Sequence, residues 1–347
     1  MIVQQTRQKQ AKQHHIYIKN PCYKQTTDLT KVYQQSIEDI FPGFFNVLPD
    51  RDLVKAEIAT EILDTRNTEN TEKKARPIVK WVGGKRQLLN ELISRMPETY
   101  GTYYEPFFGG GALFFALSPK KAVINDKNKQ LMNLYRIVRD TPVSQLTEWL
   151  TVLQKEYNEL TSDEERSSFY YAKRDEFNEF LKHGTLSFDS ACLFLFMNKV
   201  AFNGVYRENS QGLYNVPTSK RKSVTLFDKD NLILVSEMLG NCELLTGDFE
   251  EAVKNAKSGD FAFIDSPYYE TYSQYQKNGF SDDDHRRVKN MFESLTNRGV
   301  KCMLTNSDTD FMKDLYKDYN VETVNVSRNI NRNGNDRKGK EIIVRNY

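Results

Sequence analysis

Cysteine and histidine are scarce in this sequence of 347 residues, which has four of each. The cysteines lie far apart, form no CxxC pair and do not combine with the histidines into a group with zinc-ligand spacing. We therefore expect neither a metal site nor structural disulfides, as in a protein of a reducing compartment. The cysteines are Cys22, Cys192, Cys242 and Cys302.

Long apolar runs and an excess of one charge are also missing. No uninterrupted apolar stretch approaches the roughly 18 residues of a membrane span. The N-terminal stretch MIVQQTRQKQAKQHH lacks the apolar core of a secretory signal, so we expect a cytoplasmic protein. Lys and Arg total 49 against 47 Asp and Glu, which excludes few partners because a nucleic-acid enzyme needs only one basic face.

Residues 1–75 differ in composition from the rest of the chain. They are rich in glutamine, and several basic residues precede the first acid, Asp28. This composition predicts an N-terminal extension that is partly disordered, with a DNA-contacting arm or a targeting signal as alternatives. Short helices are expected over 40–53 and 53–63, and a polar linker over 64–76.

From residue 77 the sequence alternates short apolar strands, glycine turns and helices. A strand over 103–108, glycines at 109–111, a helix from 112 and a second strand ending at Asp126 follow the order of a nucleotide-binding α/β half. Long helices interrupt this order over 128–200. Further strands, expected to continue the parallel sheet, cover 242–245, 261–264, 300–304, 321–326 and 341–344.

This order predicts a Rossmann-like α/β fold with an inserted, mainly helical domain. We assign residues 76–128 and 235–347 to a catalytic, cofactor-binding domain. Residues 129–234 are assigned to the inserted domain, and 1–75 to the extension.

The strongest local motif is Phe263-Ile264-Asp265-Ser266-Pro267-Tyr268. Ligands bind where parallel strands end, and here an apolar strand ends in an acid, a rigid proline and an aromatic ring. A carboxylate and a backbone carbonyl can each accept one N–H of an amine, and a tyrosine face can clamp a flat base. An ordinary turn after a strand is the alternative interpretation.

A second motif, Glu105-Pro106-Phe107-Phe108-Gly109-Gly110-Gly111, joins a strand to a helix. Its glycines allow close backbone approach to a ligand, and Asp126 is placed to accept hydrogen bonds from ribose hydroxyls. The GxGxxG fingerprint is absent, which argues against a nicotinamide enzyme. The alternative is a tight structural turn and a strand-capping acid.

Two further segments combine basic, aromatic and amide side chains. Lys80-Trp81-Val82-Gly83-Gly84-Lys85 surrounds a glycine turn, although a tryptophan there is often only part of the core. Residues 199–222, KVAFNGVYRENSQGLYNVPTSKRK, contain a single acid. Such a loop is often only solvated surface, but this interleaving suits contacts with phosphates and base edges.

Together these motifs resemble the Dam-type family (D12 class) of DNA adenine-N6 methyltransferases, over roughly residues 77–347. KWVGGK is similar to its first motif, EPFFGGG to its cofactor loop and VINDKN to its acid-bearing strand. AFNGVYRENSQGLYNVP is similar to its recognition hairpin, IDSPY to its catalytic motif and NRNGNDRKGKEIIVRNY to its closing strands.

The resemblance implies a class I methyltransferase sheet and methyl transfer from S-adenosyl-L-methionine to N6 of adenine in duplex DNA. It further implies GATC as the site, base flipping, no metal and a monomer or weak dimer. The implied catalytic residues are Asp265, Ser266, Pro267 and Tyr268. The implied cofactor contacts are Trp81, Lys85, Phe107, Gly109, Asp126, Asp248, Phe249 and Asp265, and the implied DNA contacts are Lys80, Asn203, Val205, Arg207, Asn215 and Lys220.

One position departs from the family, which usually has Asp-Pro-Pro-Tyr where this chain has Ser266. Serine supplies the same backbone carbonyl but lacks the fixed φ of proline. We therefore expect methyl transfer to be retained, with a carbonyl that is less preorganised. Two alternatives stay open: a methyltransferase for another planar amine (cytosine N4, RNA adenine or a protein glutamine), and a catalytically silent DNA-binding relative.

Overall fold

The computed structural model describes residues 74–269, 280–327 and 338–347, which belong to one compact unit. The predicted disorder of the extension, the two short helices over 40–53 and 53–63, and most of the linker lie outside the described residues. Within them, Ala75 is buried and the Arg76 amide donates to the Asn231 side chain at 2.8 Å. The ordered packing therefore already includes the end of the assigned extension.

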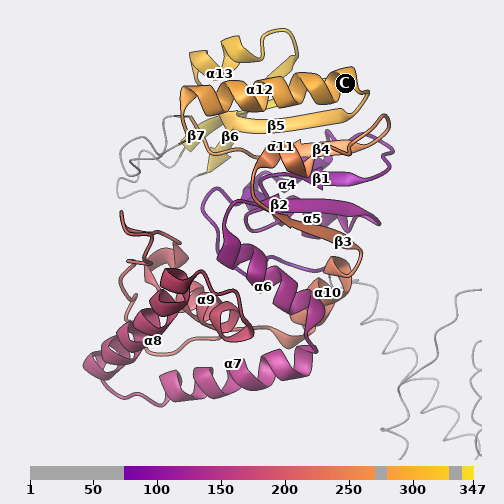
Figure 1. The fold of residues 1–347 in the computed structure, drawn as a ribbon. Helices are drawn as coiled ribbons and strands as arrows, with labels where there is room; N and C mark the ends of the chain where they lie inside the picture. Colours follow the sequence, from indigo (N-terminus) through magenta and orange to yellow (C-terminus); the bar gives the residue numbers. More distant parts are fainter. Residues whose placement is uncertain (1–73, 270–279, 328–337) are drawn as a thin grey trace, which may run out of the picture. The chain divides into compact units, whose positions relative to one another are not determined.

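A seven-stranded mixed sheet forms the centre of this unit, in the order β3-β2-β1-β4-β5-β7-β6 (Figure 1). Strands β1 to β5 are parallel, whereas β7 is antiparallel to both β5 and β6. The strands are β1 Tyr103–Glu105, β2 Ala122–Asp126, β3 Cys242–Thr246, β4 Phe261–Ile264, β5 Lys301–Ser307, β6 Asn320–Ser327 and β7 Lys338–Arg345.

The predicted Rossmann-like fold class is confirmed, with one correction. The expectation of a parallel final strand is wrong, because β7 pairs antiparallel with its predecessor in the chain and inserts between β6 and β5. Antiparallel pairing lets consecutive strands join directly, whereas a parallel pair needs a long crossover.

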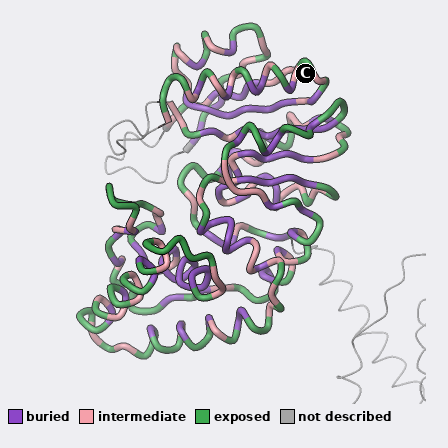
Figure 2. The backbone as a smooth tube through the Cα atoms, viewed as in Figure 1, coloured by how far each residue is buried: buried purple, intermediate pink, exposed green. Residues whose placement is uncertain are grey.

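Two hydrophobic cores lie on opposite faces of the sheet. Successive strand residues point to opposite faces, so Tyr103 and Phe261 join the core with α4 and α5, whereas Tyr104 and Ala262 join the core with α11, α12 and α13. Figure 2 shows the strands as mostly buried between these layers. The bounds are η2 Lys85–Gln87, α4 Leu89–Ile93, α5 Ala112–Leu117, α11 Phe249–Ala252, α12 Asp282–Asn297 and α13 Asp310–Leu315.

The inserted helices form a second layer beyond β3 (Figure 1). Helix α9 packs against α6 and α8, and α6 also contacts β2 and β3. A capping box of Ser162 and Glu165 begins α8, and left-handed Gly184 ends it. The bounds are α6 Lys129–Asp140, α7 Val143–Asn158, α8 Asp163–His183, α9 Phe188–Val200, η3 Phe202–Gly204 and α10 Lys229–Leu239.

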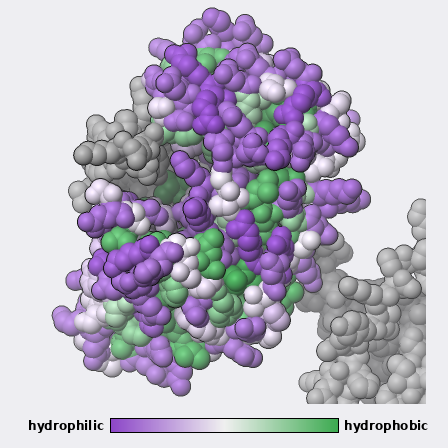
Figure 3. All heavy atoms as spheres, in the orientation of Figure 1, coloured by the Kyte–Doolittle hydropathy of each residue, from purple (hydrophilic) through white to green (hydrophobic). Residues whose placement is uncertain are grey.

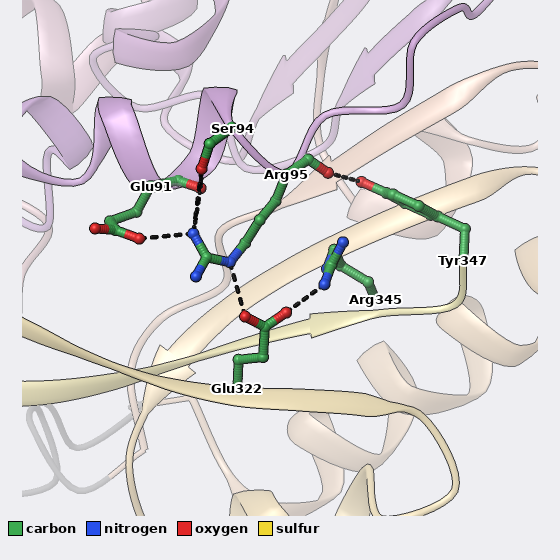
Figure 4. A network of polar contacts seen from close by, with 6 residues as sticks. All are labelled: Glu91, Ser94, Arg95, Glu322, Arg345 and Tyr347. Carbon is green, nitrogen blue, oxygen red and sulfur yellow. Dashed lines mark hydrogen bonds and ion pairs between the residues drawn. The ribbon is translucent and has the colours of Figure 1, made fainter.

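A polar network ties helix α4 to strands β6 and β7 (Figure 4). The Arg95 guanidinium donates to Glu91 at 2.6 Å and to Glu322 of β6 at 3.0 Å, and Glu322 also pairs with Arg345 of β7. The Tyr347 hydroxyl donates to the Arg95 carbonyl at 2.8 Å. The bonds of Arg95 to Glu322 and to Tyr347 join segments that are more than 200 residues apart in the chain.

Hydrophilic side chains cover most of the surface at α12 and α13 (Figure 3). In the described part of the chain, no helix is both long enough and apolar enough to cross a membrane.

Candidate active site

The order of the sheet brings two loops to the same edge. Strands β2 and β4 lie on opposite sides of β1, so the loops after β1 and β4 leave the carboxyl edge at a topological switch point. Such switch points are where open α/β sheets bind ligands. The EPFFGGG and IDSPY motifs meet here, as their strand-end positions predict.

The glycine loop after β1 is held by Asp126 and covered by Trp81. The Gly109 amide donates to Asp126 Oδ2 at 2.9 Å, and the Asn128 amide donates to Oδ1 at 2.8 Å. Gly109 has φ +50°, and an added Cβ would lie 2.6 Å from the Trp81 ring. Trp81 also stacks on Tyr206, with ring centroids 6.0 Å apart. This position therefore needs glycine, and Trp81 links the loop to the hairpin of the inserted domain.

Asp265 follows β4 and is fixed through one carboxylate oxygen. Its Oδ1 pairs with Lys85 Nζ at 2.8 Å and accepts the Thr305 hydroxyl at 2.8 Å. Among the described residues, no group donates to Oδ2. Burial raises the pKa of Asp265, although the Lys85 ammonium and the Thr305 hydroxyl act in the opposite direction. An amine approaching the strand end can therefore find a free acceptor.

The rest of the motif is held by neighbouring strands. Ser266 is buried, and its hydroxyl accepts from Asn306 Nδ2 at 3.1 Å. Lys85 Nζ lies 4.5 Å from the centre of the Tyr268 ring, and the Tyr268 hydroxyl bonds to Glu341 of β7. Pro267 is exposed between these two anchored residues.

The second half of the predicted cofactor site lies beside α11. The Phe107 and Phe249 rings are stacked with centroids 5.0 Å apart. Asp248 is the N-cap of α11, where its carboxylate accepts the Glu250 amide at 3.0 Å and pairs with Arg287 at 2.8 Å. These residues provide an aromatic surface next to a hydrogen-bond acceptor, a combination that suits a purine ring.

Carboxyl groups are the most common ionisable groups of the site. Glu105 is buried and its carboxylate accepts the Tyr103 hydroxyl at 2.8 Å. Burial raises the pKa of Glu105 well above its ordinary value, and Asp265 and Asp126 raise it further, while Lys85 lowers it. Three carboxyl groups thus interact around one ammonium group. Among the described residues, no group of three or more potential ligands could hold a metal ion.

Residues 200–219 form a hairpin on α8, and it presents most of the predicted DNA contacts. The Arg207 guanidinium donates to Asn215 Oδ1 at 2.8 Å, which holds these two side chains together. Asn203 is exposed with φ +56°, and Val205 is half-buried. The Tyr170 hydroxyl donates to the Val216 carbonyl at 2.8 Å, anchoring the returning strand of the hairpin.

The two predicted lysine contacts occupy different positions. Lys80 precedes Trp81, and its backbone bonds in both directions to the Asn198 side chain, at 2.8 and 2.7 Å. Lys220 is exposed beyond the hairpin, with φ +55°. Burial and the charge of Lys80 lower the pKa of nearby Lys199 to about 8. Lys80 and Lys199 therefore lie close enough to influence each other between the glycine turn and the hairpin.

Sequence reasoning missed four residues at this site. Thr305 and Asn306 end β5 and Glu341 lies on β7, and all three contact the IDSPY segment. Phe202 is 56% exposed beside Asn203, which is unusual for so large an apolar side chain. The polar run after the apolar part of β5 is a signal that could have indicated the first two.

The family model of the "D12 class N6 adenine-specific DNA methyltransferase" matches residues 81–330. The chain belongs to this family. It is an adenine-specific DNA methyltransferase, as the motif resemblance predicts, and DNA is its substrate.

Relatives of this methyltransferase support the assignment along almost their whole length. The Type II methyltransferase M1.LlaDCHI of Lactococcus lactis is 41% identical over 78% of this chain and 95% of its own length. The Type II methyltransferase M.MjaIII of Methanocaldococcus jannaschii is 37% identical over 78% and 99%. The DNA adenine methylase of Escherichia coli K12 is 27% identical over 79% and 96%. A solved rRNA methyltransferase of Streptomyces viridochromogenes aligns with 78% of this chain and 89% of its own, at a TM-score of 0.32 and 12% identity.

Proposed function

We propose that this enzyme transfers a methyl group from S-adenosyl-L-methionine to N6 of adenine within GATC in duplex DNA, with the target base flipped out of the helix. The observation that carries this proposal is the end of β4. There, Asp265 has a carboxylate oxygen that accepts from no described residue, next to the backbone carbonyl of Ser266 and at the edge where the glycine loop also lies.

The two acceptors define how the amine is held. One N–H of the adenine amino group donates to Asp265 Oδ2 and the other to the Ser266 carbonyl, which leaves the nitrogen lone pair free to attack. The methyl donor supplies an electrophilic carbon on a sulfonium. A new N–C bond would form as the C–S bond breaks, with the thioether as leaving group, and the methylated amine would pass its extra proton to the Asp265 carboxylate. Asp265 and Ser266 would stabilise the amine as it attacks, and because both acceptors are already in place the loop needs no rearrangement.

Two carboxyl groups at the strand ends support the choice of methyl donor. The sulfonium and ammonium of S-adenosyl-L-methionine are cations, and Asp126 at the glycine loop and Asp265 beside Lys85 are acidic groups that can lie near them. The stacked Phe107 and Phe249 beside Asp248 would receive the adenine of the donor. Trp81, Gly109 and Lys85 would border the donor at the glycine loop.

The proposed DNA contacts follow from the hairpin. Arg207 and Asn203 would read base edges, because Arg pairs with guanine and Asn with adenine in the major groove. Exposed Phe202 and half-buried Val205 supply apolar surface that can enter the base stack. Lys80 and Lys220 would contact the phosphate backbone of the DNA, and Asn215 would hold Arg207 in place. Tyr268 would stack on the flipped adenine.

The deciding experiment measures methyl transfer from labelled S-adenosyl-L-methionine to two duplexes, one with GATC and one with its adenine replaced. We expect label in the first alone, recovered as N6-methyladenine. Label in both would contradict the proposed site while keeping the chemistry. Absence of label in either, with the donor bound, would favour the silent relative, and label in RNA or at cytosine N4 would favour another amine.

A further inference from the structure

Asn306 is the buried side chain that connects the catalytic segment to β5. Its Nδ2 donates to Ser266 Oγ at 3.1 Å and to the Pro267 carbonyl at 3.3 Å. Its Oδ1 accepts the Tyr269 amide at 3.0 Å. One amide group thus holds three residues of the segment that follows Asp265, and the side chain itself is completely buried.

Neighbouring bonds make this anchor rigid. Asn306 Oδ1 also accepts the Ser307 amide at 2.9 Å, and the Ser307 hydroxyl donates to the Tyr269 carbonyl at 3.0 Å. Strand β5 pairs with β4 up to Leu304 and with β7 up to Ser307, so the sheet holds its end through β7. Asn306 therefore links the catalytic segment to a strand that the sheet holds in place.

The serine of the motif is part of this anchor. A proline at 266 would fix φ by its ring but could accept no side-chain hydrogen bond, whereas serine leaves φ free and provides Oγ. Ser266 is 1% exposed, so its hydroxyl does not face solvent or DNA. The backbone N–H of Ser266 donates to no described group, so a proline here would break no backbone hydrogen bond to that part of the chain.

We propose that Ser266 and Asn306 form a positioning pair, in which a side-chain hydrogen bond replaces the ring restraint of proline and aims the Ser266 carbonyl at the target amine. The pair rests on the proposed function, since the carbonyl matters only if it accepts from that amine. Neither side chain contacts substrate. Their effect is on the orientation of the carbonyl and therefore on the chemical step.

The test compares Ser266→Ala, Ser266→Pro and Asn306→Ala in the full chain by single-turnover methylation of GATC duplex. Ser266→Ala leaves φ free without the bond, so kcat falls, by up to about 100-fold if the carbonyl moves by about 1 Å. Ser266→Pro retains most of the activity. The KM values for donor and DNA stay close to those of the native protein in both variants, and the folded fraction of each, measured by titration with bound donor, is used to normalise kcat so that a general loss of folding is not mistaken for the effect.

The double variant separates positioning from packing. Asn306→Ala lowers kcat strongly in the native background and much less together with Ser266→Pro, because the ring then fixes the loop. Equal losses in both backgrounds would overturn the proposal, as would full activity of Ser266→Ala or loss of activity in Ser266→Pro.

Hydrogen exchange tests the pair without any enzymatic activity, so it can be used if Asn306→Ala fails to fold or the native protein is inactive. Hydrogen exchange of the peptide that contains residues 265–269 should be faster in Ser266→Ala than in the native protein, since Asn306 then loses one of its bonds. Unchanged exchange would contradict the pair. An inactive native protein with the expected exchange would contradict only the proposed function.

Discussion

At the scale of single residues, the carboxylate of Asp265 is the group on which most of the proposed chemistry depends. We expect Asp265→Asn to lower kcat by about 100- to 1,000-fold, the usual cost of removing one preorganised charge-stabilising group. The amide can donate where the carboxylate only accepts, and it removes the charge that pairs with Lys85. Single-turnover methylation measures the loss, with exposed Asp310→Asn as the control. Activity near the native level would exclude the assigned role.

A second prediction concerns the buried carboxyl of Glu105. Burial raises its pKa well above the ordinary value, so the folded protein binds this proton more tightly than the unfolded chain does. Stability is then lost as the pH rises from the unfolded pKa toward the folded one. We expect Glu105→Gln to be more stable than the native protein at pH 8, by about 1.4 kcal/mol for each unit of pKa shift that it removes.

Urea unfolding at pH 5 and pH 8, without donor, measures the effect of Glu105→Gln. The gain should be larger at pH 8, because the native carboxyl retains more of its proton at pH 5. Glu243→Gln, at an exposed position of β3, is the matched control and should follow the native profile. An equal gain at both pH values would show that packing, and not titration, is responsible.

At the scale of elements, the hairpin over 200–219 and Lys220, which follows it, are expected to make two kinds of DNA contact. We expect Arg207→Ala to relax discrimination at one base pair by about 1–3 kcal/mol. Lys220→Ala should instead weaken binding to GATC and unrelated duplexes equally and reduce the salt slope by about one. Binding titrations over a range of salt concentrations test both. Uniform weakening by Arg207→Ala would show that its guanidinium contacts phosphate only.

The elements also show how far the sequence determines the site. The range of β4, Phe261–Ile264, follows from four apolar residues between Asp260 and Asp265, and its end correctly locates the motif. The contacts of Asn306 and Glu341 could not be predicted, because they depend on β5 lying beside β4 and on β7 lying beside β5. Local pattern reveals that a strand exists but gives neither its neighbours nor its direction.

Trp81 illustrates the same limit for a single contact. Its place before a glycine turn allows either a core or a cofactor role, and both are consistent with the sequence. The structure places it between Gly109 and Tyr206, two residues that are nearly 100 positions apart. A residue that joins two elements in this way is recognisable only once their packing is known.

At the scale of the whole molecule, the methyltransferase unit is shorter than the chain. Residues 74–347 form one compact unit, the family match begins at residue 81, and M.MjaIII matches over 99% of its own length while covering 78% of this chain. The relatives therefore carry out their named activity without a counterpart of the N-terminal extension. The start of this extension is basic, with no acid before Asp28.

We accordingly expect a protein that begins at Lys74 to methylate GATC with the kcat of the full chain. Both proteins should also be stabilised equally by S-adenosyl-L-methionine, by about 2.7 kcal/mol at a donor concentration of 100 times Kd. If the basic extension acts as a DNA-contacting arm, its deletion raises the KM for DNA and lowers the salt slope while kcat and donor stabilisation stay the same. A fall in kcat or in donor stabilisation would show that the extension belongs to the catalytic unit.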